Sequence, residues 1–315
     1  MVLVILSFTM TSGCAIVAQI NLPTSDPPVS TSATTSATPF TAVTNTPVVI
    51  PATYTPSPTF TPTATYTPSA TFTPTPTDTP FTNPTPTLVY YPAGQVIAPI
   101  LLYHHISDSN YGSRYYVTPG VFRTQMEKLR DWGYSTITVS DLVEVLIYGG
   151  ELPAQPILIT FDDGNIDIYN YAFPIMHELG MVGNFYIIAN SILSRGYVNS
   201  EQMREMIDDG WEIGSHSMSH ADLTVDYSKI RFEVLQSRQL LQEALGEPIN
   251  TFAYPYGKTD SFVSTQVSDY GYRAGMGLGR SWEHTLGTLF YLSRIEVQSD
   301  YSLPTFAALL PWSGD

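Results

Sequence analysis

The 315-residue chain has one cysteine, Cys14, and no lysine or arginine before Arg114. A single cysteine excludes an intramolecular disulfide and a cysteine-based zinc site. The chain holds 28 acidic and 13 basic residues, and all the acidic ones except Asp26 and Asp78 follow position 93. An acidic region of this kind is poorly suited to nucleic acid, whose phosphates are neutralised by Lys and Arg. We therefore expect no nucleic-acid partner.

The residues before and around Cys14 indicate export. Met1–Phe8 is apolar, and three small residues, Thr11, Ser12 and Gly13, directly precede Cys14. This resembles the lipobox of a bacterial lipoprotein, in which the cysteine is lipidated and becomes the mature N-terminus. The basic residues that open a signal peptide are absent, so an uncleaved apolar anchor is the alternative. Residues 1–20 are predicted to be a signal or lipoprotein-like segment, which gives an extracellular or cell-envelope location with a lipid anchor at Cys14.

A stretch of Pro, Thr, Ser and Ala follows, with aromatic residues at six-residue intervals from Tyr54 to Phe72. Six-residue repeats can form a β-helix, but proline in each repeat removes backbone donors and no aliphatic core accompanies them. Such a segment cannot bury enough apolar surface to offset its ordering entropy. Residues 21–95 are predicted to be a disordered, extended tether.

From residue 96 onward, β-rich apolar runs alternate with helical patterns, which predicts a single α/β domain over residues 96–315. We expect an irregular (β/α) barrel of about seven strands, with a doubly wound open sheet as the alternative. The predicted strands cover 96–103, 135–139, 156–161, 182–188, 211–214, 251–254, 272–276 and 290–297. The predicted helices follow the N-caps Thr118, Ser140 and Asp226 and also cover 168–179, 200–209 and 261–270.

Four polar clusters directly follow predicted strands: Tyr103–His105, Asp162–Gly164, His216–His220 and Tyr254–Gly257. Both candidate architectures place the active site at the carboxyl ends of the strands. The clusters are therefore expected to meet in one site.

The residue types in two of these clusters suit a divalent metal. Adjacent carboxylates at the end of an apolar strand are costly to bury unless they are paired or metal-bound. Histidines four apart on one helical turn, as predicted for His216 and His220, can bind one ion. Either pattern alone is more typical of a surface turn or surface helix. Together they offer two imidazoles and a carboxylate, a set that suits zinc or a similar ion.

These motifs resemble those of the polysaccharide deacetylase family, also called carbohydrate esterase family 4 or the NodB-homology domain. Thr160–Gly164 reads TFDDG and matches the first family motif without change. His216–His220 matches the second, H-[ST]-x-x-H. Ala253–Gly257 matches the third, R-x-P-Y-G, only in part because Ala253 replaces its first residue, arginine. The resemblance covers residues 96 to 300.

The resemblance implies a role for each matched position. Asp163, His216 and His220 would bind a divalent ion, most readily zinc, with cobalt or nickel as alternatives. Asp162 would be the general base that takes a proton from a metal-bound water. The backbone N–H of Tyr256, together with the metal, would stabilise the oxyanion.

The general acid is not where the family usually carries it, because the late segment Leu292–Ile295 contains no histidine. Poly-N-acetylglucosamine deacetylases carry a Tyr-His motif on the first strand instead, and Tyr103–His104 is similar to it. His104 is therefore the predicted general acid, with His105 as the alternative. Arg294 could replace the arginine missing from the third motif, or could serve only to stabilise the fold.

The expected activity is metal-dependent removal of N-acetyl groups from an N-acetylglucosamine-containing polysaccharide at the cell envelope, by a monomeric hydrolase. An esterase acting on O-acetylated xylan would use the same site. A catalytically silent glycan-binding module is a third hypothesis, and the intact set of Asp162, Asp163, His216 and His220 argues against it. The sequence names neither the polymer nor the metal.

Overall fold

The computed structural model describes residues 86–109 and 112–313. The predicted lipoprotein-like segment with Cys14 and nearly all of the predicted tether lie outside these residues. The domain begins before residue 96, because strand β1 (Leu88–Tyr91) pairs antiparallel with β7 (Gly150–Pro153). The boundary predicted at residue 96 is therefore about eight residues late.

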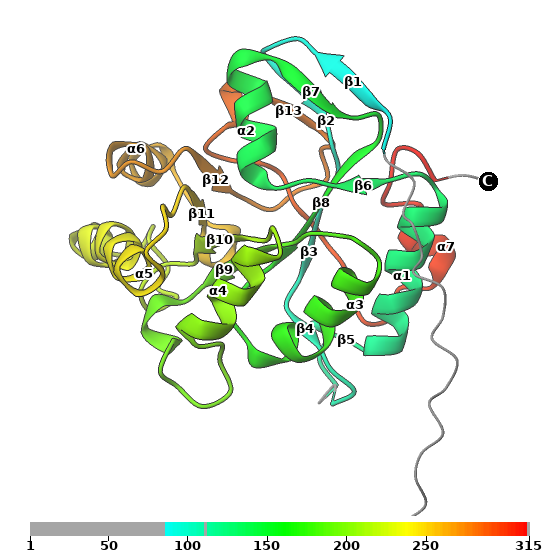
Figure 1. Cartoon of the computed structure of the whole chain (residues 1–315). Coiled ribbons are helices and arrows are strands. Elements are labelled where there is room, and N and C mark those ends of the chain that lie inside the picture. The colour runs from blue at the N-terminus through cyan, green and yellow to red at the C-terminus, as the bar shows by residue number, and fades with distance from the viewer. Residues whose placement is uncertain (1–85, 110–111, 314–315) are drawn as a thin grey trace, which may run out of the picture. The chain divides into compact units, whose positions relative to one another are not determined.

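A seven-stranded parallel sheet forms the centre of the domain (Figure 1). The short strand β6 (Ser135–Thr136) pairs with one of its members, β8. The strands in spatial order are β12 (Ala274–Met276), β11 (Thr251–Ala253), β10 (Glu212–Ser215), β9 (Asn184–Ile187), β8 (Pro156–Phe161), β3 (Ile100–Tyr103) and β14 (Ile295–Glu296).

Backbone hydrogen bonds join the two edges of this sheet. The segment that leads into β14, one edge strand, runs beside β12, the other. Met276 and Leu292 form a parallel bridge, the Gly277 N–H donates to the Leu292 carbonyl over 2.9 Å, and the Gly279 N–H donates to the Arg294 carbonyl over 2.9 Å. The sheet is therefore curled into an irregular barrel, which confirms the predicted fold class over the open-sheet alternative.

Alternate residues of the strands belong to two separate apolar clusters. Leu101, Ile159 and Phe185 belong to the larger cluster, which includes residues of α1, α4, α5 and α6. Ile100 and Leu158 belong to a smaller cluster that includes residues of α2. Because side chains alternate between the two faces of a strand, the smaller cluster lies on the inner face of the barrel. Polar residues that follow the inner-face positions point into the barrel mouth.

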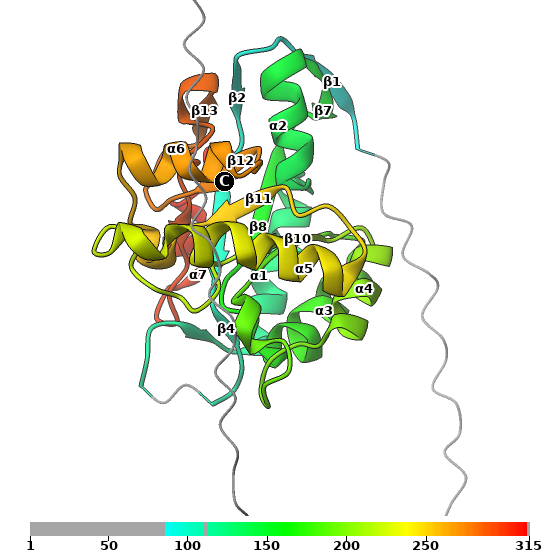
Figure 2. The ribbon, with the colours of Figure 1, turned by 90° about the vertical axis from the view of Figure 1, so that its left-hand side faces the viewer.

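Helices cover the outside of the sheet, as the two perpendicular views show (Figures 1 and 2). Thr118 caps α1 as predicted, with Pro119 at the first helical position. The helix predicted to follow Ser140 instead begins at Val139 and is capped by Thr138. The α-helices are α1 (Pro119–Asp131), α2 (Val139–Tyr148), α3 (Phe173–Glu178), α4 (Ser200–Asp208), α5 (Ser237–Leu245), α6 (Ser261–Asp269) and α7 (Leu303–Ala307).

Two predicted helices are interrupted by other helical geometries. The helix predicted over 168–179 begins as the π-helix η1 (Ile168–Ala172) and continues as α3. The helix predicted after Asp226 consists of the 3₁₀ turn η3 (Tyr227–Lys229), the π-helix η4 (Arg231–Gln236) and α5. Apolar periodicity does not separate these helix types, whose backbone hydrogen bonds span three, four or five residues.

Two predicted strands are shorter than expected. The run 96–103 divides into β2 (Gln95–Ile97), which pairs antiparallel with β13 (Glu283–Thr285), and β3. Proline at position 99, which has no N–H to donate, separates them. In the run 290–297 only β14 is a strand, and 286–288 forms the 3₁₀ turn η6.

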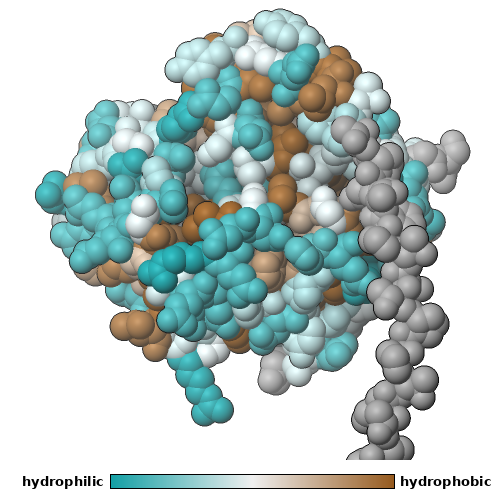
Figure 3. Space-filling model, in the orientation of Figure 1, coloured by the Kyte–Doolittle hydropathy of each residue, from teal (hydrophilic) through white to brown (hydrophobic). Residues whose placement is uncertain are grey.

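The surface of the domain fits its acidic composition. Figure 3 shows hydrophilic side chains over much of one face, with an apolar patch near β1 and β7. Leu88 and Val89 of β1 are exposed. No helix of the described region combines the length and the apolarity that crossing a membrane requires.

Candidate active site

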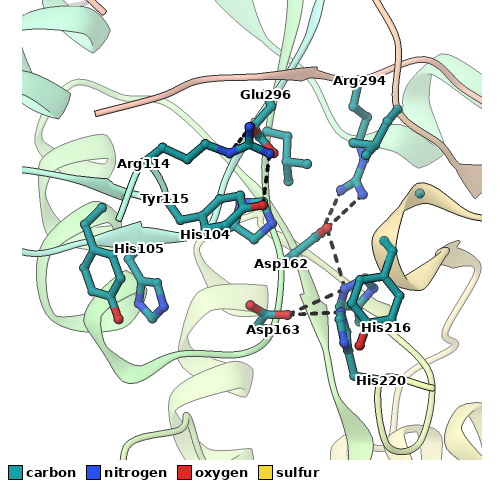
Figure 4. A pocket seen from close by; sticks show the side chains of 15 residues that line it. His104, His105, Arg114, Tyr115, Asp162, Asp163, His216, His220, Arg294 and Glu296 are labelled. Atoms are coloured by element: carbon teal, nitrogen blue, oxygen red, sulfur yellow. Dashed lines mark hydrogen bonds and ion pairs between the residues drawn. The ribbon is translucent and has the colours of Figure 1, made fainter. Parts of the chain in front are cut away.

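The four polar clusters meet at the carboxyl ends of the strands, as predicted from their positions in the sequence. They line a cavity of about 350 Å³. Figure 4 shows its labelled side chains, which come from the segments after β3 and β8, the segment before Tyr116, the loop after β10 and the segment around β14. The predicted residues that line it are His104, its alternative His105, Asp162, Asp163, His216, His220, Tyr256 and Arg294.

Asp163, His216 and His220 form the one group in the described region whose side chains could hold a metal ion together. One ligand atom from each residue lies within 4.8 Å of the other two. Asp163 Oδ1 is 3.6 Å from His216 Nε2 and 3.7 Å from His220 Nε2. These distances exceed hydrogen-bond length and leave room for an ion among the three atoms. The set is the three-ligand type that leaves further positions open.

The protonation of the imidazoles also fits a metal. His216 Nδ1 lies 2.9 Å from the Ala253 carbonyl oxygen. An N–H on Nδ1 donates to that carbonyl, so the lone pair is left on Nε2, which faces Asp163. Burial and the neighbouring His216 lower the pKa of His220, which favours the neutral ring that a metal requires. The residues present therefore fit a divalent cation.

The two histidines do not lie on a helical turn, so that part of the prediction is wrong. They enclose a loop in which Ser217 has φ 67° and His220 has φ 62°. The described region contains only two other non-glycine residues with positive φ, Asp163 and Tyr256, and both line the same cavity. Left-handed backbone is unfavourable for these residue types, and such conformations concentrate at functional sites.

Asp162 is held by Arg294 through two hydrogen bonds of 2.7 and 2.8 Å, one to each carboxylate oxygen (Figure 4). Both residues are buried, and Arg294 also donates from Nε to the Gly277 carbonyl. Burial disfavours the charged carboxylate, but Arg294 and His216 outweigh burial and lower the pKa of Asp162 to about 2. Asp162 is therefore a carboxylate at any physiological pH.

The two neighbouring histidines after β3 have different surroundings. His104 lies four residues after Ile100, so its side chain is on the same face of the extended chain. It lines the cavity, and its ring lies 4.6 Å from that of Tyr115. Its Nδ1 is buried and has no hydrogen-bond partner in the part of the chain that the structure describes. Burial lowers the pKa of His104, while Asp162 and Asp163 oppose that shift.

His105, in contrast, is bound to groups outside the ligand set. Its Nδ1 lies 2.7 Å from Asp167 Oδ2, and its ring stacks on Tyr116 at 4.0 Å. It belongs to β4 (His105–Ile106), which pairs with β5 (Tyr116–Val117). The adjacent histidines are thus directed to different partners, as alternation along an extended chain requires.

Tyr256 lies in the 3₁₀ turn η5 (Pro255–Gly257), where its own backbone is left-handed. Its ring is 4.5 Å from that of His220 and its side chain is exposed. Lys258 lies over the outer face of the ring and pairs with Asp222 at 2.6 Å. The turn therefore forms one wall of the cavity beside the histidine loop.

Sequence reasoning missed two features of the site. Arg114 and Tyr115 line the cavity, and Arg114 pairs with Glu296 at 3.3 Å. No motif marks them, because they come from an irregular segment. The second feature is Glu233, which accepts hydrogen bonds from the histidine loop. The sequence could have indicated this burial, because Glu233 lies three residues after Ile230 and four residues before Ser237. That spacing puts all three on one side of the helix, and all three are buried.

The family described as polysaccharide deacetylase matches residues 149–275 of this chain. That segment contains Asp162, Asp163 and both ligand histidines. This segment of the chain is therefore similar to the polysaccharide deacetylase family. This confirms the resemblance seen in the motifs.

Several members of the family are similar over most of the domain. YxkH of Bacillus subtilis, named as a polysaccharide deacetylase, is 28% identical over 213 residues, which are 67% of this chain and 75% of the relative. A poly-β-1,6-N-acetyl-D-glucosamine N-deacetylase of Staphylococcus aureus is 22% identical over 62% of this chain and 73% of its own length. The crystal structure of a polysaccharide deacetylase from Bacillus cereus superposes with a TM-score of 0.61 at 25% identity, over 68% of this chain and 69% of that one.

Proposed function

We propose that this protein is a metal-dependent N-deacetylase of an N-acetylglucosamine polysaccharide. The observation that carries the proposal is a single cavity in which the Asp163, His216 and His220 set lies beside an ionised carboxylate, Asp162. A silent glycan-binding module would not need a carboxylate held in its charged form next to a metal site. The match to the polysaccharide deacetylase family supports the reaction class.

A divalent ion bound by the three ligands would act as a Lewis acid on the acetamide and raise the acidity of the attacking water. The Asp162 carboxylate accepts the proton that this water loses as its oxygen bonds to the carbonyl carbon. Arg294 fixes both oxygens of Asp162, so the base is oriented before substrate arrives. The contact with Arg294 also lowers the basicity of Asp162. The raised acidity of the attacking water offsets this lower basicity.

The amide C–N bond breaks only if the departing nitrogen gains a proton. His104 is the group proposed to supply it, because its ring lines the cavity and its Nδ1 is not engaged by the described residues. The products are acetate and a free amine on the sugar. The Tyr256 backbone N–H is proposed to stabilise the oxyanion, since the Pro255–Gly257 turn lies directly beside His220.

The polymer is proposed to be poly-N-acetylglucosamine. Two observations support this choice: the Staphylococcus aureus relative carries that activity in its name, and the Tyr103–His104 pair replaces the late histidine of other family members. A general acid is needed far more for an amine leaving group than for an alcohol, so His104 also favours N-acetyl over O-acetyl substrates.

The test is mass spectrometry of the products formed by the full-length protein with Zn²⁺. The panel consists of β-1,6- and β-1,4-linked N-acetylglucosamine oligomers, peptidoglycan fragments and O-acetylated xylan oligomers. We expect loss of acetyl groups from the β-1,6 oligomers, and no loss with the Asp163→Asn variant. Faster release from acetylated xylan, or equal release by the variant, would contradict the proposal.

The location is also a proposal, namely a lipid anchor at Cys14 that holds the enzyme at the cell envelope. It rests on the apolar Met1–Phe8 segment and the small residues before Cys14. Fractionation of cells that express the full chain would test it. We expect the wild-type protein in the membrane fraction and Cys14→Ser in the medium or periplasm, and equal distribution of the two would exclude the anchor.

A further inference from the structure

Glu233 is a buried carboxylate that contacts the histidine loop (Ser217–Ser219, between the two ligand histidines). It is 2% exposed and comes from the π-helix η4. Its Oε2 accepts the N–H groups of Met218 and Ser219 over 3.1 and 2.9 Å, and its Oε1 accepts the Ser219 hydroxyl over 2.6 Å. Among the described residues it has no ion-pair partner, so its charge is compensated by these donors.

The histidine loop has an unfavourable backbone that requires such support. Ser217 and His220 both have positive φ, and left-handed residues cost of order 1–3 kcal/mol each unless their surroundings fix them. Two carbonyls of the loop accept from the segment after β9, the strand beside β10: Ala189 N–H donates to Ser217 O, and Asn190 N–H donates to Met218 O, each over 3.0 Å. The Ser217 hydroxyl accepts from the His220 N–H over 2.8 Å.

Among the described residues, the N–H groups of Met218 and Ser219 have Glu233 as their one acceptor. Hydrogen bonds to an ionised acceptor are roughly twice as strong as neutral ones. The loop therefore has a defined conformation before any ion is bound, and that conformation sets the position of His220 relative to His216.

We propose that Glu233 is a positioning residue that preorganises the two histidines for the metal, without contacting metal or substrate itself. The inference rests on the metal site of the proposed function. It predicts that loss of Glu233 weakens metal binding as well as folding. Groups that support metal ligands from behind typically contribute 10- to 100-fold to metal affinity.

Two substitutions separate the hydrogen bonds of Glu233 from its charge. Glu233→Ala removes all three contacts. Glu233→Gln can keep them, because its amide oxygen can accept both backbone N–H groups and its amino group can donate to the Ser219 hydroxyl. We expect Glu233→Ala to weaken Zn²⁺ binding by roughly 10- to 100-fold, and Glu233→Gln to restore most of it. Ser219→Ala, at an exposed position, should weaken binding by a smaller factor.

A matched control comes from the same helical segment. Arg238 holds the Ile249 and Tyr270 carbonyls over 2.8 and 3.2 Å, without contacting the loop. Arg238→Met therefore loses partly buried hydrogen bonds of its own. If Glu233 only stabilised the fold, Glu233→Ala and Arg238→Met would both be less stable in the metal-free form. The two variants would then bind the metal with the same affinity.

The experiment is competition for Zn²⁺ against a chelating dye, with the thermal midpoint of the metal-free full-length protein measured alongside. We expect the dissociation constant to rise for Glu233→Ala and to stay at the wild-type value for Arg238→Met. If Glu233→Ala does not fold, Ser219→Ala and Glu233→Gln provide the same comparison. The proposal is overturned if Glu233→Ala and Ser219→Ala bind Zn²⁺ like wild type, if Arg238→Met weakens binding equally, or if Glu233→Gln is as weak as Glu233→Ala. A wild-type protein that bound no divalent ion would instead overturn the metal site.

Discussion

Arg294 binds both carboxylate oxygens of Asp162 although the two residues are 132 positions apart. Asp162 follows β8, and Arg294 directly precedes β14, with β3 between the two strands. The guanidinium also lies over the Tyr186 ring, 5.5 Å from its centroid. The segment that closes the barrel thus brings an arginine to Asp162, and this chain has no arginine in its third motif. Ala253, which stands in that motif position, contributes its carbonyl to His216 instead.

Arg294→Lys keeps the positive charge and loses the two-pronged contact with Asp162. We expect this variant to fold and to retain metal while kcat falls by roughly 10²-fold, because a misplaced catalytic group has effects of that order. Steady-state kinetics on an N-acetylglucosamine oligomer measure the change. Wild-type kcat in this variant would show that Arg294 only stabilises the fold.

Arg294→Met leaves Asp162 buried without its partner. Breaking a buried ion pair from one side typically costs about 3–5 kcal/mol of unfolding free energy. The double variant Asp162→Asn/Arg294→Met removes both charges and should recover part of that loss. Urea denaturation of the metal-free proteins measures both values, and an equal loss in the single and double variants would argue against the pairing.

His104→Ala should lower turnover of an N-acetyl substrate by roughly 10²–10⁴-fold, the usual contribution of a general acid, and should leave metal content unchanged. An aryl acetate, whose leaving group barely needs a proton, should be hydrolysed almost as fast as by wild type. His105→Ala serves as the matched control, since it removes an adjacent imidazole that is bound to Asp167. Equal losses on amide and ester, or a larger loss in His105→Ala, would assign the general acid elsewhere.

Much of this site could be predicted from the sequence because strand periodicity fixes where the carboxyl ends lie. Once Pro156–Phe161 is recognised as a buried strand, Asp162 and Asp163 must emerge at the barrel mouth. The local backbone could not be predicted in the same way. His216 and His220 have the spacing of a helical turn, and the left-handed alternative depends on tertiary contacts that the spacing does not reveal, including those of Glu233. For Arg294 the sequence left two roles open, because its contact with Asp162 depends on how the barrel closes.

The metal set predicts the outcome of removing its imidazoles. Elemental analysis of the purified full-length protein should find about one divalent ion per chain, and the double variant His216→Ala/His220→Ala should have none. Added Zn²⁺ should raise the thermal midpoint of wild type but not of the variant, since only a bound ion stabilises the folded state. His177→Ala is the control, because His177 is an exposed histidine paired with Asp209. Retention of the ion by the double variant would refute the assignment.

His284 predicts a pH dependence of folding that is independent of catalysis. It is fully buried on β13, its Nε2 lies 3.0 Å from the Ala98 carbonyl oxygen, and burial lowers its pKa to about 4. An unfolded histidine titrates near pH 6.5, so between pH 6.5 and 4 the unfolded chain binds the extra proton. The contribution of His284 to stability is therefore complete above pH 6.5 and is lost as the pH falls towards 4.

The size of this effect follows from the difference between the two pKa values, and amounts to about 3 kcal/mol at most. Urea denaturation at pH 7.5, 6, 5 and 4.5, with a chelator present to exclude metal release, measures it. His284→Gln can still donate to the Ala98 carbonyl but cannot titrate, so its unfolding free energy should fall less over this range than that of wild type. His177→Gln, which changes an exposed histidine, should follow the wild-type curve. Parallel curves for wild type and His284→Gln would mean that protonation of His284 does not oppose folding.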